Sequence, residues 1–200
     1  MTKKAKTKPG WVIWFVGLPG AGKSTYAGAV YEVLKQENVN VAYLSMDRRR
    51  ELYFPDPEYT EKERVRAYMF FAEDAAQIAY DGQNVIMDGT AHRLSMREYM
   101  RHLVPHFAEI LIRCPLDIAV KRESNRPENA LITAGLYEKA LSRKETGVHY
   151  EGLGEVIGVD TEFEENPSAE CIIESDKESI EQGRDKVLAL ISAWQPDSTK

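Results

Sequence analysis

The sequence is poor in the residues that form covalent or metal cross-links. Only two of its 200 residues are cysteines, Cys114 and Cys171, and each lies in or beside an apolar run, so we expect buried free thiols rather than a disulfide. The four histidines show no spacing to cysteine that indicates a zinc site. A chain of this length can bury a substantial hydrophobic core in one compact domain.

Long apolar segments and an excess of positive charge are also missing. No apolar run approaches the roughly 20 residues that a membrane-spanning helix needs, so we expect no membrane partner. The formal net charge of −6 argues against a nucleic-acid-binding surface, although a local basic pocket for a small anion is compatible with it. Residues 1–10 are basic without the apolar stretch of a signal peptide, which predicts a disordered tail on a cytoplasmic protein.

Short apolar runs alternate with helical patterns from residue 11 onwards. This alternation is typical of an α/β fold, with an open, mainly parallel sheet flanked by helices on both faces. Strands are predicted at residues 11–16, 41–44, 84–87, 109–113 and 170–173, and helices at 22–36, 61–80, 95–104, 116–123, 138–144 and 177–193. Five glycines and scattered charge make residues 123–163 the least regular part, where we expect a lid on a single domain spanning 11–195.

The turn after the first predicted strand matches the phosphate-binding pattern G-x-x-x-x-G-K-[ST]. It reads Gly17, Leu18, Pro19, Gly20, Ala21, Gly22, Lys23, Ser24, Thr25. Its glycines let successive backbone N–H groups point at phosphate oxygens, and the following helix adds its positive N-terminus. Lys23 is expected to contact the β- and γ-phosphates of ATP, and the Ser24 hydroxyl to bind Mg²⁺. A chance match in an ordinary turn is disfavoured, because the required strand and helix surround the motif.

The segment after the fourth predicted strand favours a kinase over a regulatory GTPase. A GTPase normally carries a guanine-reading N-K-x-D motif after a late strand, whereas this chain has Cys-Pro-Leu-Asp at 114–117. The helix that follows ends in Lys121 and Arg122, at the start of the expected lid. We therefore predict that Arg122 binds ATP, although a solvated charged face explains a single basic residue here nearly as well.

Two aspartates stand where strands end. Asp47 comes just after the second predicted strand, a position that faces the ligand crevice of an open α/β sheet. A carboxylate there can accept the proton of an attacking hydroxyl or help to hold Mg²⁺. Asp88 closes the third strand and is expected to bind Mg²⁺. For each aspartate the alternative is a helix cap or turn residue.

Three arginines are placed to bind an anionic acceptor. Arg50 follows Asp47, Arg64 lies early on the long predicted helix, and Arg97 follows the third strand. Guanidinium groups suit bidentate recognition of phosphate or sulfate oxygens. Other basic residues close by compete for this role, namely Arg48, Arg49, Arg66, Arg93 and Arg101, whereas His92 and His102 are expected to be packing or surface residues.

Over residues 11–193 the chain resembles the adenylyl-sulfate kinases, which make 3′-phosphoadenylyl sulfate. The phosphate loop resembles the family's G-L-S-G-A-G-K-S-T, with Pro19 in place of serine. Gly-Leu-Tyr-Glu-Lys-Ala at 135–140 is similar to the family's G-L-Y-K-K-A lid segment. The sequences at 158–160 and 166–167 are similar to its G-I-D and N-P motifs.

The chain departs from this family in the segments that bind the acceptor. The family's D-G-D-N-x-R motif keeps its second Asp and its Arg, at Asp47 and Arg50, but Ser45 replaces the first Asp. Arg64 matches an acceptor-binding Arg, while Ala67 replaces an Asn. In the family's K-G-F-T-G-I-D segment, the Lys and the adenine-stacking ring fall at residues 154 and 156, here Gly and Val. The rings that could substitute are those of Tyr53, Phe54, Tyr59 and Tyr150.

The resemblance implies a doubly wound sheet with the phosphate-loop strand at its centre, and a homodimer. It implies phosphorylation of the 3′-hydroxyl of adenylyl sulfate by ATP, with Lys23 and Mg²⁺ stabilising the transferred group and Ser24 and Asp88 holding the metal. Asp47 is expected to orient or deprotonate the hydroxyl. The residues expected to bind the acceptor are Asp47, Arg50, Arg64, Arg97 and Lys139. The alternatives are a kinase for another nucleotide conjugate, a sugar or an amino alcohol, and a nucleotide-binding regulator without catalysis.

Overall fold

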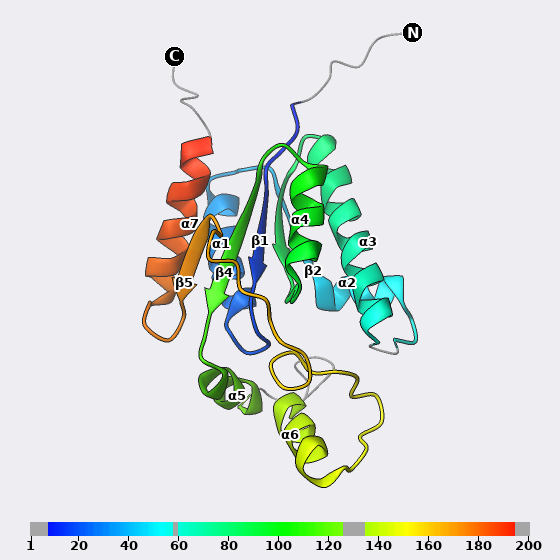
Figure 1. The fold of residues 1–200 in the computed structure, drawn as a ribbon. Helices are drawn as coiled ribbons and strands as arrows, with labels where there is room; N and C mark the ends of the chain where they lie inside the picture. Colours follow the sequence, from blue (N-terminus) through cyan, green and yellow to red (C-terminus); the bar gives the residue numbers. More distant parts are fainter. Residues whose placement is uncertain (1–7, 58–59, 126–134, 195–200) are drawn as a thin grey trace, which may run out of the picture.

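The computed structural model describes residues 8–57, 60–125 and 135–194. Five strands form one parallel sheet in the order β2-β3-β1-β4-β5. Their bounds are β1 Val12–Val16, β2 Val41–Ser45, β3 Asn84–Asp88, β4 Phe107–Arg113 and β5 Cys171–Glu174. The strand before the phosphate loop is therefore central, and all five carboxyl ends point toward the same edge of the sheet (Figure 1).

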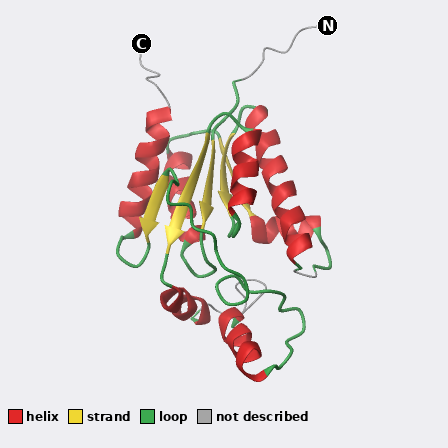
Figure 2. Cartoon of the chain, viewed as in Figure 1, coloured by secondary structure: helices red, strands yellow, loops and turns green. Residues whose placement is uncertain are grey.

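Seven helices accompany this sheet in the described part of the chain. They are α1 Lys23–Gln36, α2 Met46–Tyr53, α3 Glu61–Tyr80, α4 Leu94–Leu103, α5 Leu116–Ser124, α6 Leu136–Thr146 and α7 Ile180–Trp194. Helices α1 and α7 cover one face and α3 and α4 the other, while α5 and α6 lie beyond the carboxyl ends of the strands (Figures 1 and 2). This arrangement confirms the predicted doubly wound α/β fold.

The strands are apolar on both sides because helices cover both faces. Trp14 of β1 faces α3, where its ring lies 5.8 Å from each of the rings of Tyr68 and Phe71. Its neighbour Phe15 belongs to the core on the α1 and α7 side, and both side chains are fully buried. The uninterrupted apolar run at 11–16 thus predicted a central strand correctly, since alternation with polar residues would have indicated a half-exposed one.

The structure adds one helix that the sequence did not indicate. In α2, only Met46 and Arg50 are buried, and three consecutive arginines leave no apolar stripe. A helix without such a stripe carries no periodic hydrophobic signal. Cys114 is buried and Cys171 partly buried, and both are free, as expected. No helix in the described residues is long and apolar enough to cross a bilayer. Most of the predicted N-terminal tail lies outside the described residues, as does Tyr59.

Candidate active site

The phosphate loop has a backbone that requires glycine. Gly17 and Gly20 have φ values of 145° and 78°, in the region that favours glycine. A Cβ atom at Gly17 would lie 2.4 Å from the carbonyl oxygen of Ile112, and one at Gly20 would lie 2.3 Å from that of Ala119. The loop is therefore fitted closely against β4 and α5.

The first turn of α1 begins directly at this loop. Gly22 is its N-cap residue and has no side chain to satisfy the free N–H groups of the first turn. These groups and the positive end of the helix dipole suit a phosphate. The Lys23 ammonium donates to the Leu18 carbonyl at 2.9 Å, which holds it across the loop. Loop, helix end and ammonium together form an anion site.

Asp88 lies beside this anion site, at the carboxyl end of β3. Its side chain is 6% exposed, and burial raises the pKa of its carboxyl group, although the Lys23 charge and hydrogen bonds from Ser24 and Tyr43 lower it. The Tyr43 hydroxyl donates to Oδ2 of Asp88 at 3.0 Å. The structure thus brings together Lys23, Ser24 and Asp88, which the sequence had selected separately.

Asp47 connects the phosphate side of the crevice with the arginines. It is exposed in the first turn of α2, and its charge contributes to the raised pKa of Asp88. Burial raises the pKa of the Tyr68 hydroxyl, and the Asp47 charge raises it further, whereas the Arg50 and Arg64 guanidinium groups lower it. Asp47 lies three residues before Arg50 in α2, at the carboxyl end of β2.

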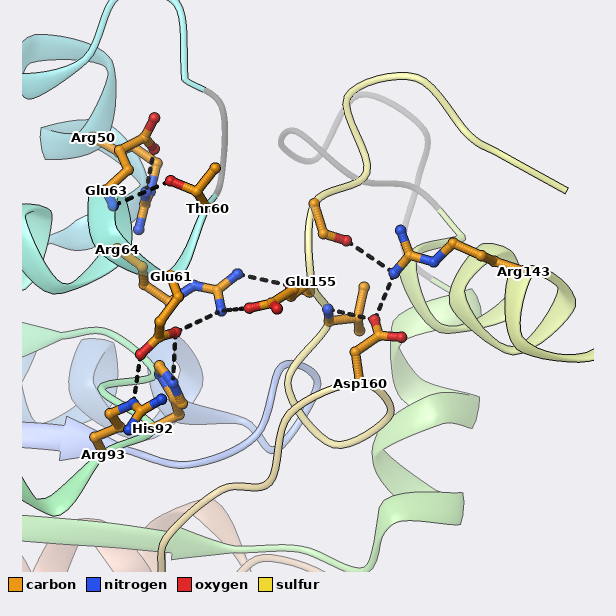
Figure 3. Close-up of polar contacts among 12 residues, drawn as sticks. Arg50, Thr60, Glu61, Glu63, Arg64, His92, Arg93, Arg143, Glu155 and Asp160 are labelled. Carbon is orange, nitrogen blue, oxygen red and sulfur yellow. Dashed lines mark hydrogen bonds and ion pairs between the residues drawn. The ribbon is translucent and has the colours of Figure 1, made fainter. Parts of the chain in front are cut away.

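Two of the three predicted acceptor arginines, Arg50 and Arg64, are buried and paired with carboxylates (Figure 3). Nη1 of Arg50 lies 3.1 Å from Oε1 of Glu63. Arg64 donates to the backbone carbonyl of Glu155 at 2.7 Å, and the carboxylates of Glu61 and Glu155 each lie 3.8 Å from its other terminal nitrogen. An anionic acceptor must therefore share or replace these carboxylates to reach the guanidinium groups.

Residues after β3 extend this cluster. Arg93 Nε lies 2.5 Å from Glu61 Oε1, and His92 Nε2 lies 3.4 Å from Glu61 Oε2. His92 is almost fully buried, and this burial lowers its pKa to about 4, so the ring is neutral at pH 7. His92 is thus a buried packing residue, as expected from the sequence.

Arg97 lies away from this cluster. Its side chain has no exposed surface, and its guanidinium group contacts Glu109, the Glu164 carbonyl and the ring of Phe163. Glu109 is the third residue of β4, far along the strand from the carboxyl edge. We therefore leave Arg97 out of the proposed acceptor site. The sequence has many arginines in this region, and it could not distinguish those that pair with buried protein groups from those that bind a ligand.

Arg122 lies beside the phosphate loop. Its guanidinium group donates to both the hydroxyl and the carbonyl oxygen of Ser175, at 3.0 and 2.8 Å, and lies 3.4 Å from the Ala21 carbonyl. The turn after β5 thus holds it at the nucleotide end of the site. Lys139 is exposed on α6.

The segment that follows α6 replaces a stacking ring with a buried valine. Val156 is 2% exposed and packs with Tyr137, Ala140 and Leu153. Arg143 of α6 holds this segment by donating to the Gly154 carbonyl at 3.0 Å and to the Asp160 carboxylate at 2.6 Å (Figure 3). Of the rings considered as substitutes, Tyr53 and Phe54 pack on Phe70 of α3 and Tyr150 packs against this cluster.

A pocket of about 310 Å³ opens at the carboxyl edge beside the phosphate loop. Gly17 and Leu18, the end of β4, residues 158–163 and Glu165 line it. Ligands of open α/β folds bind at this edge of the sheet. Sequence reasoning missed Tyr43 and Glu155, whose partners lie 45 and 91 residues away.

The site consists of a strand, a glycine-rich loop and a helix that begins with Lys23 and Ser24. The Asp88 carboxylate on the adjacent strand lies beside Lys23 and Ser24. This arrangement defines a P-loop phosphotransferase. Such a site binds a nucleoside triphosphate and positions its terminal phosphate. The family model for adenylylsulphate kinase matches residues 9–174, and the chain belongs to this family. The resemblance found in the sequence is thereby confirmed.

Individual relatives and one solved structure are similar to this chain over most of its length. A probable adenylyl-sulfate kinase of Archaeoglobus fulgidus is 31% identical over 167 residues, which are 84% of this chain and 97% of the relative. A cytidine diphosphoramidate kinase of Campylobacter jejuni is 29% identical, over 82% of this chain and 85% of its own length. The structure of the Mycobacterium tuberculosis APS kinase in complex with AMPPNP and APS shares the fold, with a TM-score of 0.74 at 20% identity over 92% and 98% of the two chains.

Proposed function

We propose that this chain transfers the γ-phosphoryl group of ATP to the 3′-hydroxyl of adenylyl sulfate, giving 3′-phosphoadenylyl sulfate. One observation carries the proposal: Asp47 lies in the first turn of α2, two residues after Ser45, which pairs with Asp88 at the phosphate loop, and three residues before Arg50. A carboxylate between a phosphate site and an anion site is placed to meet the attacking hydroxyl. The family and its relatives support adenylyl sulfate as the acceptor.

Mg²⁺ suits the residues at the phosphate loop. Among the described residues no group of three or more acidic, histidine or cysteine side chains could enclose a metal ion. Mg²⁺ does not need one, because it keeps several waters and binds through one or two protein oxygens and the substrate phosphates. We propose that the Ser24 hydroxyl and the Asp88 carboxylate hold it. When bound, the ion neutralises charge that develops on the phosphate oxygens.

The protein's own residues position the reactants. The loop amides and Lys23 bind the β- and γ-phosphates, and Arg122 contacts the nucleotide from the lid side. Asp47 accepts a hydrogen bond from the acceptor hydroxyl and takes its proton as the bond to phosphorus forms. Arg50 and Arg64 hold the acceptor's anionic groups, and Lys139 approaches them from the lid. Phosphoryl transfer needs little more from a protein than such positioning and charge stabilisation.

A coupled ADP-release assay tests this function. We expect ADP release from Mg-ATP to rise strongly when adenylyl sulfate is added, and chromatography to detect 3′-phosphoadenylyl sulfate. The Asp47→Asn variant should retain ATP binding and lose turnover. Release of ADP that adenylyl sulfate does not stimulate would exclude the proposed acceptor. ATP binding without turnover on any acceptor would support a regulator instead.

A kinase for a different nucleotide conjugate is the second candidate. It is favoured by the buried Val156 at the position of a stacking ring, by Glu155 beside Arg64, and by similarity to the C. jejuni cytidine diphosphoramidate kinase. Losing a base-stacking ring removes roughly 1–3 kcal/mol of binding. Comparing kcat/KM for adenylyl sulfate and cytidine diphosphoramidate distinguishes the two candidates, because the true acceptor should give the larger value.

We also propose that residues 11–195 act as one kinase domain, with residues 123–163 as its lid. The dependence on ATP favours a cytoplasmic location, and neither nucleic acid nor membrane is needed as a partner. The family resemblance supports a homodimer. Light scattering coupled to size-exclusion chromatography tests the oligomeric state, and a mass of one chain would exclude the dimer.

A further inference from the structure

The carboxylate beside the phosphate loop stands at the end of β3, on Asp88. The D-G-D-N-x-R pattern that this chain resembles begins with Asp at the end of the second strand, where this chain has Ser45. In the sheet, Ser45 of β2 pairs with Asp88 of β3. Paired residues on neighbouring strands lie side by side, since the strands run about 4.8 Å apart. The carboxylate that this chain lacks at position 45 is therefore present at the neighbouring position 88.

Side chains alternate between the two faces of a strand, and this alternation places the side chains of Ser45 and Asp88 on the face that packs against α1. Tyr43 and Ile86 belong to the core on the α1 side, and the Tyr43 ring lies 5.5 Å from the ring of Tyr31 in α1. Ser45 and Asp88 each lie two residues further along their strands, so their side chains share that face. On this face lies the first turn of α1, where the Ser24 side chain hydrogen-bonds Asp88.

Tyr43 fixes the carboxylate in this place. Its hydroxyl donates to Oδ2 of Asp88 at 3.0 Å, from the strand that carries Ser45. A phenol has an ordinary pKa of about 10 and therefore carries, near pH 7, the proton that this hydrogen bond needs. A phenol that donates to one oxygen orients the whole carboxylate.

We propose that Asp88, oriented by the positioning residue Tyr43, supplies from β3 the carboxylate that the D-G-D-N-x-R pattern carries at the position of Ser45 on β2. The inference rests on the metal-nucleotide part of the proposed function and is independent of the acceptor. Its consequence is that the carboxylate can be moved between the two strands. An Asp placed at position 45 should compensate for the loss of the one at position 88.

Calorimetric titration with AMP-PNP, with and without Mg²⁺, tests this exchange without any acceptor. Asp88→Ala should bind the metal-free nucleotide as the parent does but lose the gain in affinity that Mg²⁺ provides. The double variant Ser45→Asp/Asp88→Ala should recover that gain to within about tenfold. If the double variant folds and binds AMP-PNP but shows no recovery, the proposal is wrong, whereas failed activity with adenylyl sulfate would count only against the acceptor.

Tyr43→Phe tests the positioning role. Removing the hydroxyl should raise the Mg²⁺ concentration needed for tight AMP-PNP binding by about tenfold, as is typical when a partner of a metal ligand is lost. Metal-free affinity should stay unchanged, which a merely structural role would not predict. Tyr31→Phe is the matched control, because its ring packs on Tyr43. Equal Mg²⁺ dependence in Tyr43→Phe and the parent would overturn this role.

Discussion

At the residue scale, the burial of the ionisable Asp88 carboxyl group makes the stability of the folded protein depend on pH. Because its pKa is raised in the folded protein, the neutral form contributes stability below the ordinary carboxyl pKa. That contribution disappears as the pH rises through the raised pKa. At pH 8 the folded protein therefore holds a charge that the unfolded chain accommodates more easily.

Asp88→Asn should accordingly raise the melting temperature of the metal-free protein at pH 8. Each ~1 kcal/mol gained corresponds to about 2–4 °C for a chain of this size. The advantage should shrink as the pH falls through the raised pKa of Asp88 and vanish near the ordinary carboxyl pKa, where the carboxyl group is neutral in both states. Asp56→Asn, at an exposed position outside the site, is the control. A variant that melts below the parent at pH 8 would contradict the pKa direction.

Lys23→Ala should reduce turnover by about 10²–10³-fold, the loss typical of removing one charge-stabilising donor from a reaction centre. Its ammonium is held across the phosphate loop by a hydrogen bond to the Leu18 carbonyl, so alanine at this position removes a positive charge directly at the phosphate site. Steady-state kinetics measure the effect. Lys35→Ala, in the last turn of the same helix, should keep full activity.

Glu155→Gln should lower the KM for adenylyl sulfate by up to about fivefold, with kcat unchanged. The carboxylate of Glu155 is half exposed and competes with an anionic acceptor for Arg64, and such exposed pairs contribute ~1 kcal/mol at most. The exposed Glu151 offers a matched control as Glu151→Gln. An unchanged or higher KM in Glu155→Gln would show that the carboxylate does not oppose acceptor binding.

At the scale of elements, α6 is joined to the phosphate loop through one tyrosine. The fully buried Tyr137 donates its hydroxyl to the Pro19 carbonyl at 2.9 Å. Tyr137→Phe should lower the melting temperature by about 2–4 °C, since a buried hydrogen bond is worth ~1 kcal/mol. It should also raise the KM for ATP. Tyr150→Phe, whose hydroxyl bonds Ser142 within the lid, should leave that KM unchanged.

The sequence predicted elements best where burial is continuous. Apolar runs located all five strands to within two residues, because a parallel sheet covered on both faces needs apolar side chains throughout. Helix α2 was missed because its buried surface comes from Met46 and an arginine paired with Glu63. The sequence predicted the start of the last helix at residue 177, three residues before α7 begins at Ile180, because the preceding turn contains residues that are common in helices.

At the candidate site too, the sequence located residues that belong to a local pattern and missed those that depend on distant partners. Lys23, Ser24 and Asp88 follow strands or a local motif, so their positions could be predicted from residues close to them in sequence. Tyr43 and Glu155 act through partners brought near only by strand order and by the path of the lid. Arg97 resembled an anion-binding residue in sequence because charge alone does not reveal a buried partner on β4.

At the scale of the whole molecule, the chain leaving the lid is attached to the sheet just before β5. The Glu164 N–H donates to the His92 carbonyl at 2.8 Å, Arg97 binds the Glu164 carbonyl, and Arg113 Nε lies 2.9 Å from Glu165. These contacts hold the downstream end of residues 123–163, the proposed lid, in place. We therefore expect any movement of that lid to be limited to the part upstream of Glu164, which amide hydrogen exchange with and without a bound nucleotide would measure.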